Sequence, residues 1–338
     1  MKKIVSLIYA LCFSLFCFSQ NSSYNSNSIP IGGVNCIALG NGCLPFNTGS
    51  RNIALGQNAL HSNTAGNLNI AIGFGALYSN IEWSGSIAIG DSSLFSNITG
   101  AANTAIGNYT LLSNVSGFQN TAIGERALYS NINGLNNTAI GWSALFSNRN
   151  GTQNTAIGLG ALKTTISGES NTAIGNNALG YNISSRNVAV GVNTLIFNTT
   201  GSKNSAVGTW AMQSNLTGSS NVAFGNSSLI LNTSGQSNVA IGDSAGFNSL
   251  GTGNIYIGKR AGFKEIGSNK LYLANDSNKT IIYGDISTGQ VLIGNPKPDG
   301  YIFKGTRSLN VLGGIITDSL RVAISSNWAD YVFSEKYE

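Results

Sequence analysis

The residues that could perform chemistry in this chain are few and widely spaced. The sequence contains a single histidine, His61, and 13 acidic residues among 338. A metal site or a Ser/His/Asp triad needs several such side chains to converge, and one histidine without clustered cysteine or carboxylate partners cannot supply either. We therefore predict no metal, no cofactor and no catalytic residue, and we interpret His61 as a surface substitution.

The acidic residues of the repeated part of the chain also argue against catalysis. Glu82 and Asp91 are the closest pair there, and nine positions separate them. Cleavage of a glycosidic bond requires two carboxyl groups about 5 to 10 Å apart. The sequence therefore predicts a protein that is not an enzyme. A polysaccharide-cleaving enzyme is the alternative, and it would need carboxylates or basic residues clustered on one face of neighbouring coils.

The first 20 residues have the pattern of a secretory signal peptide. Lys2 and Lys3 precede an apolar run, as in the sequence MKKIVSLIYALCFSLFCFSQ. The alternative, an uncleaved anchor, is disfavoured because the run is short for a membrane span. No later stretch is apolar over about 18 residues. We predict an exported chain, secreted or associated with the cell surface or outer membrane, whose mature part has no membrane-spanning segment.

Four cysteines occur, and two of them, Cys12 and Cys17, lie in the leader. The other two, Cys36 and Cys43, would meet an oxidising compartment after export. One interpretation is a disulfide between Cys36 and Cys43, and the other is two unpaired thiols. The sequence leaves both open.

The composition restricts the class of partner. Only 9% of the residues are charged, 42% are hydrophobic, and the net charge is +5. Basic residues are scattered without a Lys/Arg run, so we expect no nucleic-acid partner. The polar remainder is rich in Asn, Ser and Thr, which together with the apolar fraction does not fit a disordered chain.

One short word recurs along most of the chain. In the stretch NNTAIGWSALFSNRNGTQNTAIG, residues 136–158, the word TAIG appears twice, and its two glycines are 17 residues apart. Fourteen such words end at Gly40, Gly56, Gly73, Gly90, Gly107, Gly124, Gly141, Gly158, Gly175, Gly191, Gly208, Gly225, Gly242 and Gly258. A fixed period of 16 or 17 residues predicts a solenoid of about fourteen stacked coils. Helical coils are disfavoured by the abundant Gly, Asn and Thr.

Positions counted from the repeat glycine predict the form of each coil. Side chains alternate between the two faces of a strand, so the Thr and Ile of TAIG share one face, and the Ala and Gly share the other. Leucine recurs four residues after the glycine, and Asn and Gly recur seven and ten residues after it, a spacing that suits a β-turn. We predict two short strands and two turns in each coil of an all-β, parallel β-solenoid.

The two strand faces predict an interior and an interface. We expect Ile and Leu to fill the core, and Thr to point inward with Ile. The small Ala/Gly face would then need a close partner, which we predict to be the same face of two sister chains, or of one. The predicted interface residues are Ala105, Ala122, Ala139, Ala156 and Ala173, and the predicted structural glycines are Gly107, Gly124, Gly141, Gly158 and Gly175. The alternative is that tight turns place the alanines inside a single chain.

An aromatic column is the one candidate ligand site. It follows the leucine position and contains Tyr78, Phe95, Tyr129 and Phe146. Exposed rings in a row would form an apolar stripe for a glycan or protein ligand. The interpretation we favour is that these rings pack at a subunit boundary or under a neighbouring loop.

The word and its spacing resemble the head repeats of trimeric autotransporter adhesins, the YadA-like heads, over residues 34–262. The resemblance lies in NTAIG, which ends at Gly107, Gly124 and Gly141. It implies a left-handed parallel β-roll, assembled as a trimer and displayed at a bacterial surface for attachment. The coiled coil and the membrane-inserting segment of those adhesins have no counterpart after Gly262.

The C-terminal part resembles tail-fibre-like secreted repeat proteins, in which such rolls precede an assembly module. The matching residues are Trp328, Asp330, Tyr331, Val332 and Phe333. Five segments are expected: a signal peptide (1–20), a linker (21–33), the roll (34–266), a β transition (267–300) and a truncated stub (301–338). We expect an adhesin-like, non-catalytic, oligomeric rod with an unknown surface glycan or protein ligand, and a passive spacer or stalk is the second alternative.

Overall fold

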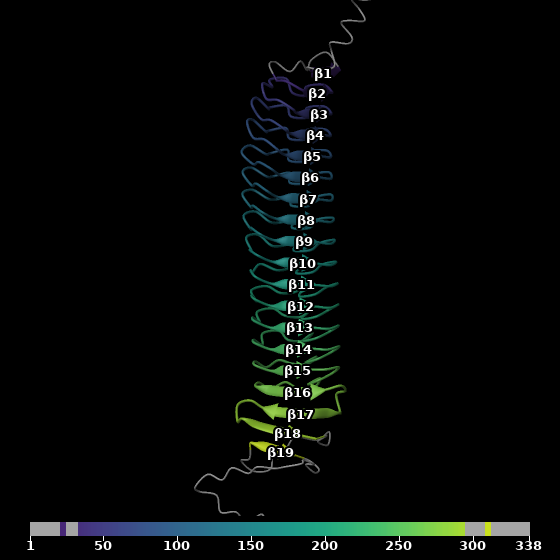
Figure 1. The fold of residues 1–338 in the computed structure, drawn as a ribbon, viewed down its shortest axis with the longest axis vertical. Coiled ribbons are helices and arrows are strands. Elements are labelled where there is room, and N and C mark those ends of the chain that lie inside the picture. The colour runs from purple at the N-terminus through teal and green to yellow at the C-terminus, as the bar shows by residue number, and fades with distance from the viewer. Residues whose placement is uncertain (1–20, 25–32, 295–307, 312–338) are drawn as a thin grey trace, which may run out of the picture.

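The computed structural model describes residues 21–24, 33–294 and 308–311, which form strands and turns without any helix. The strands stack one above another along an elongated rod (Figure 1). They are β1 (Asn21–Tyr24), β2 (Cys36–Leu39), β3 (Ile53–Leu55), β4 (Ile70–Ile72), β5 (Ile87–Ile89), β6 (Thr104–Ile106), β7 (Thr121–Ile123), β8 (Thr138–Ile140), β9 (Thr155–Ile157), β10 (Thr172–Ile174), β11 (Val188–Val190), β12 (Ser205–Val207), β13 (Val222–Phe224), β14 (Val239–Ile241), β15 (Ile255–Ile257), β16 (Lys270–Ala274), β17 (Thr280–Asp285), β18 (Gln290–Ile293) and β19 (Leu309–Val311).

Each repeat of the sequence contributes one coil to the rod. Successive strands from β1 to β16 pair in parallel, and their register places like residues above like, as in Thr121↔Thr138, Ala122↔Ala139 and Ile123↔Ile140. Strand stacking of this kind adds about 4.8 Å per coil. The predicted fold class, an all-β parallel β-solenoid with coils of 16 or 17 residues, is confirmed.

Within each coil the structure differs from the prediction of two strands. Only the TAI-type word forms a strand, three residues long, as in β8. The opposite wall consists of turns, because residues two and four positions after the glycine have positive φ, such as Arg126 (58°) and Leu128 (51°). A left-handed residue cannot continue an extended strand. That wall still bonds to the next coil, for example from Leu128 N to the Ala144 carbonyl at 2.9 Å.

The interior agrees with the prediction for leucine and is the opposite of it for the two faces of the strand: the alanines, not the isoleucines and threonines, point inward. The alanine of every word from β2 to β14 is buried, and the leucine column, including Leu128 and Leu145, is fully buried as well. The isoleucines lie on the outer face of the strands, where Ile123 is 36% exposed. The predicted interface at Ala105, Ala122, Ala139, Ala156 and Ala173 is wrong, since all five are fully enclosed by their own chain.

The small side chains follow from the narrowness of the coil. Alternation fixes only which residues share a face, and the leucine that closes the opposite wall leaves room for a methyl group alone between the two walls. The structure therefore adopts the alternative in which the alanines belong to the interior of one chain.

Asparagines line the rest of the interior in two ladders. In one ladder Asn131 Nδ2 donates to Asn114 Oδ1 of the preceding coil at 2.7 Å and to the Gly134 carbonyl at 3.0 Å. In the other, Asn137 Nδ2 donates to Asn120 Oδ1 at 3.1 Å. The predicted Asn-x-x-Gly turn is thus closed by the asparagine side chain. Buried amides satisfied in this way connect each coil to its neighbours.

The glycine that ends each word sits where a side chain would collide with the next coil. Gly124 has φ +125°, and a Cβ there would lie 2.8 Å from the backbone of Gly141. The equivalent glycines predicted as structural, Gly107, Gly141, Gly158 and Gly175, also have φ between +127° and +134°. This conformation is readily adopted only by glycine.

The C-terminal end of the rod changes architecture. Strands β16, β17 and β18 pair antiparallel, and β19 returns to parallel pairing with β18 (Figure 1). This change falls in the predicted transition segment, 267–300. At the other end, β1 lies within the predicted linker and pairs with β2. The predicted signal peptide and most of the predicted stub, including Trp328 to Phe333, lie outside the described residues.

Candidate functional site

The largest continuous feature of the surface is the outer face of strands β2 to β15. Thr and Ile of each word point outward and are half-buried to exposed, for example Thr138 and Ile140 in β8. Towards the C-terminus valine replaces threonine, and Val188 and Val222 are 37% and 40% exposed. We call this surface the strand face; it is formed by Ile37 and Leu39 of β2 and by the first and third residues of each strand from β3 to β15. It is mainly apolar, with Thr or Ser at the first position of β6 to β10 and β12, and runs the length of the roll.

The predicted aromatic column forms two separate ladders of stacked rings. His61 stacks on Tyr78 with centroids 4.8 Å apart, and Tyr78 stacks on Phe95 at 4.9 Å. In the second ladder Tyr129 stacks on Phe146 at 5.0 Å with an interplanar angle of 12°. The centroid spacing equals the coil spacing, so the ladders follow directly from the repeat. All five rings are half-buried.

A groove runs beside the second ladder. An open cavity of about 390 Å³ is lined by Tyr109, Arg126, Tyr129 and Phe146. A second cavity of about 170 Å³ follows in the next coils and is lined by Gly160, Lys163, Thr164, Asn177, Gly180, Tyr181 and Ile196. Both cavities lie between the second and the fifth or sixth residues after the repeat glycine. The two cavities are separate but occupy the same wall of successive coils, and we call this wall the aromatic groove.

Two basic side chains border the aromatic groove. The Arg126 side chain is 47% exposed, and its Nε lies 3.7 Å from an oxygen of Glu125, which is 50% exposed. Lys163 is exposed, and its Nζ lies 5.4 Å from the centroid of the Trp142 ring. Exposed pairs of this kind bind weakly and leave the cations available to an anionic ligand.

His61, Glu82 and Asp91, for which we predict no catalytic role, do not form a cluster in the structure. His61 occupies the aromatic ladder, with Phe46 packed edge-on at 6.1 Å. Asp91 accepts a hydrogen bond from the Phe74 amide at 3.1 Å, and Glu82 is exposed. Among the residues that the structure describes, no group of three or more His, Cys, Asp or Glu side chains could hold a metal ion.

The two cysteines are thiols and occupy different columns of the repeat. Cys43 takes an alanine position and donates to the Gly40 carbonyl at 3.0 Å. Cys36 takes an asparagine position and contacts the Gly49 carbonyl and Asn47 Nδ2. The structure therefore contains no bridge between Cys36 and Cys43, and the interpretation as a disulfide is wrong for this structure.

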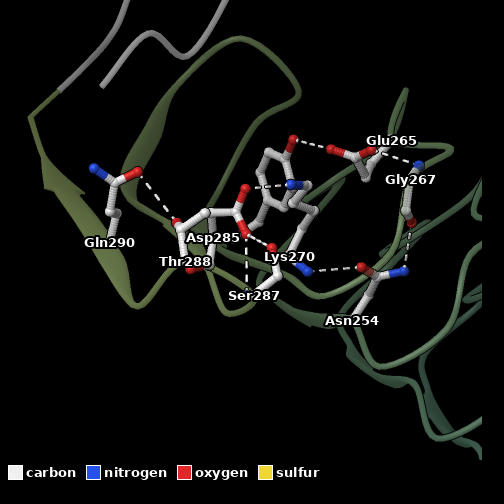
Figure 2. A network of polar contacts seen from close by, with 9 residues as sticks. Asn254, Glu265, Gly267, Lys270, Asp285, Ser287, Thr288 and Gln290 are labelled. Atoms are coloured by element: carbon white, nitrogen blue, oxygen red, sulfur yellow. Dashed lines mark hydrogen bonds and ion pairs between the residues drawn. The ribbon is translucent and has the colours of Figure 1, made fainter. Parts of the chain in front are cut away.

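A polar network closes the C-terminal end of the roll (Figure 2). Lys270 Nζ donates to Asp285 Oδ2 at 2.6 Å, and the Ser287 hydroxyl donates to Asp285 Oδ1. These two hydrogen bonds lower the pKa of Asp285 to about 2. The Tyr272 hydroxyl donates to Glu265, whose other oxygen accepts from the Gly267 amide. The network joins β16 to β17, and its two carboxylates are partly buried and hydrogen-bonded, so we interpret it as structural.

The function has to be inferred from the surfaces of the chain itself. No family model, no curated protein and no solved structure matches the chain. In the described ranges, no helix is both long enough and apolar enough to cross a membrane. We base the functional proposal on two surfaces, the strand face and the aromatic groove.

Sequence reasoning found part of these surfaces. It grouped Tyr78, Phe95, Tyr129 and Phe146 correctly as a column, but it missed the basic border of the groove and the stacked pair Tyr181–Phe197. Tyr181 follows a glycine and lies one position later in its coil, which hid it from a strict count. A count that tolerates shifts of one residue would have found it.

Proposed function

We propose that this chain is an exported, non-catalytic, adhesin-like protein that assembles into a rigid homotrimeric rod for attachment at a cell surface. The observation that carries this proposal is the strand face: a mainly apolar surface that runs along fourteen strands, β2 to β15, and that no other part of the described residues covers. Soluble proteins rarely leave so long an apolar surface in water.

The size of the strand face fits an interface between chains. Two outward side chains in each of fourteen strands match the roughly 20 to 30 residues that each partner contributes to a standard interface. Its residues are mainly Ile, Val and Thr, and it carries no charged side chain from β3 to β15. A partner with the same geometry and the same coil spacing matches it along its full length, and a sister chain has both.

A trimer is the assembly that the resemblance favours. The NTAIG word resembles the YadA-like heads, in which three rolls lie side by side. Three equivalent chains that present one flat face to a common axis form a closed cyclic arrangement. In the trimer that we propose, the strand face forms the interface between chains, where the sequence had suggested the alanine face.

The aromatic ladders and the aromatic groove, which lie outside the strand face, support a role in attachment. The aromatic ladders and the groove lie on the wall beyond the glycine turn, so a trimer would display three copies of each. Multiple copies on one rigid particle raise the strength of binding to a repetitive surface without any new contact. The acidic residues are sparse and separated, and the single histidine stacks on Tyr78 and packs edge-on against Phe46, which favours binding over catalysis.

Binding of the purified full chain to immobilised polysaccharides, host-matrix proteins and whole cells tests this proposal. We expect saturable binding to at least one surface, with no change in the chain length of any polysaccharide. Uniform absence of binding would contradict attachment and favour a passive spacer. Shortened polysaccharide products would contradict the non-catalytic assignment. Cell fractionation of the producing organism tests export, and a cytoplasmic product would contradict it.

A further inference from the structure

The aromatic groove combines two features that point to one class of ligand. Tyr129 and Phe146 offer a pair of stacked rings at the side of an open cavity, and Tyr109 adds a third, 41% exposed ring. Because Tyr129 and Phe146 stack on each other at the coil spacing, the edges of their rings, not the faces, line the cavity, and apolar ring edges beside a few polar groups suit the C–H surface of a sugar ring. The two cavities are open and follow one another along the rod, so they suit a chain better than a single small molecule.

The charged residues of the aromatic groove favour a negatively charged ligand. Between Gly107 and Gly191 the sequence has four basic and two acidic residues. Arg126 lines the first cavity and Lys163 lines the second. The acidic neighbour, Glu125, makes a loose and exposed contact at 3.7 Å, which an incoming carboxylate can replace. Arginine also binds carboxylates through two parallel hydrogen bonds.

The spacing of the two cations sets a repeat length. Arg126 and Lys163 belong to coils whose glycines are Gly124 and Gly158, two coils apart. At about 4.8 Å per coil the two positions are displaced by about 10 Å along the rod. This length is close to that of one extended disaccharide, so a polysaccharide with one carboxylate per disaccharide would meet both cations in turn.

We propose that the aromatic groove binds an extended acidic polysaccharide that runs along the rod axis. Its carboxylates pair with Arg126 and Lys163, and the sugar rings between them lie against Tyr129 and Phe146. This inference rests on the proposed attachment function and names its ligand class.

The repeat itself supplies matched variants for the test. The test variant is Arg126→Asn with Lys163→Gln, because Asn177 and Gln213 occupy the equivalent positions of other coils. The control is Arg149→Thr with Arg186→Gln, because Thr233 and Gln153 occupy the equivalent positions there. Both variants lose two positive charges, and circular dichroism during heating checks that both retain the fold. A third variant, Tyr129→Ser with Phe146→Ser, removes the ring platform.

Binding to alginate and polygalacturonate, and to the same polymers after reduction of their carboxyl groups, is then measured for the full-length chain. We expect the test variant and the ring variant to bind the acidic polymers at least about tenfold more weakly, the control to change less than about twofold, and the reduced polymers to bind weakly. Equal losses in test and control variants would overturn the inference, as would equal binding of the reduced polymers. If the wild type binds neutral glycans, proteins or cells but no acidic polymer, the inference fails and attachment stands; if it binds no surface at all, both fail.

Discussion

The Tyr256 ring packs against Gly262 and occupies the space that a leucine side chain fills in other coils. Tyr256 replaces the alanine of its word in β15, and its ring is fully buried with the hydroxyl 3.0 Å from Ser249 Oγ. Gly262 replaces the leucine of the same coil, and a Cβ there would overlap the tyrosine ring. Burial raises the pKa of the Tyr256 hydroxyl, as expected for a phenol withdrawn from water. The alanine and leucine columns therefore face each other across the interior.

Restoring the alanine–leucine pair of the other coils should recover part of the stability that is lost with the Tyr256 ring. We expect Tyr256→Ala to lower the free energy of unfolding by about 3 to 5 kcal/mol, since it empties a buried site. Adding Gly262→Leu should regain about half of that, because Leu128 holds the equivalent position with a similar φ, 51° against 60°. Urea denaturation measures both. A double variant no more stable than Tyr256→Ala would contradict the facing columns.

Enlarging an alanine of the interior should destabilise the rod. We expect Ala122→Leu to lower the free energy of unfolding by about 1 to 3 kcal/mol through overpacking between the two walls. The control, Thr121→Val on the strand face, should change it by less than about 0.5 kcal/mol. Thermal and urea unfolding provide the comparison. Equal stability of the two variants would show that Ala122 has free space beside it.

The architecture could be predicted from the sequence, whereas the direction of the strand faces could not. The period fixes the number of coils and places Ala122 above Ala139, because equal coils stack in register. Alternation cannot tell which of two faces points inward, and the larger Ile123 suggested the wrong one. The joint change at Tyr256 and Gly262 was the signal that could have decided it, since two columns that exchange volume must touch.

The buried asparagine ladder predicts a second stability effect. We expect Asn131→Ala to cost about 1 to 3 kcal/mol, because it removes the donor of Asn114 Oδ1 and the acceptor of Asn148 Nδ2, whereas the Gly134 carbonyl keeps Asn120 Nδ2 as a donor. Asn150 is exposed, and Asn150→Ala serves as the control, with an expected change below about 0.5 kcal/mol. Hydrogen exchange of the neighbouring coils locates the effect. Similar costs at the two positions would contradict the ladder as a source of stability.

The C-terminal hairpin should open in acid. The pKa of Asp285 falls from 3.8 to about 2 in the folded chain, so its ion pair stabilises the hairpin above pH 4, and this contribution is lost as the pH falls from 4 toward 2. We expect faster amide exchange in β16 and β17 over that range. Asp285→Asn should flatten the pH dependence, and Asp243→Asn should not. An unchanged profile in Asp285→Asn would contradict this assignment.

The candidate site could be predicted only in part, because the sequence does not show which columns of the repeat lie on the same wall of the coil. The rings of the aromatic column follow one another in the sequence period, so Tyr129 and Phe146 could be grouped from their spacing alone. Arg126 and Lys163 belong to different columns and line different cavities, and only the folded coils show that the two cavities follow one another on one wall. Charged residues that are far apart in the sequence lie on the same wall of a solenoid when their positions within the repeat belong to that wall.

The mass of the purified chain in solution tests the central proposal most directly. The chain of 338 residues has a mass of 35.1 kDa. Multi-angle light scattering should give three times the mass that denaturing mass spectrometry gives for the same purified chain. Ile123→Asp with Ile140→Asp, which places charges in the strand face, should reduce it to a single chain without loss of the β-sheet circular dichroism signal. A wild-type protein that remains one stable chain at all concentrations would contradict the trimeric rod.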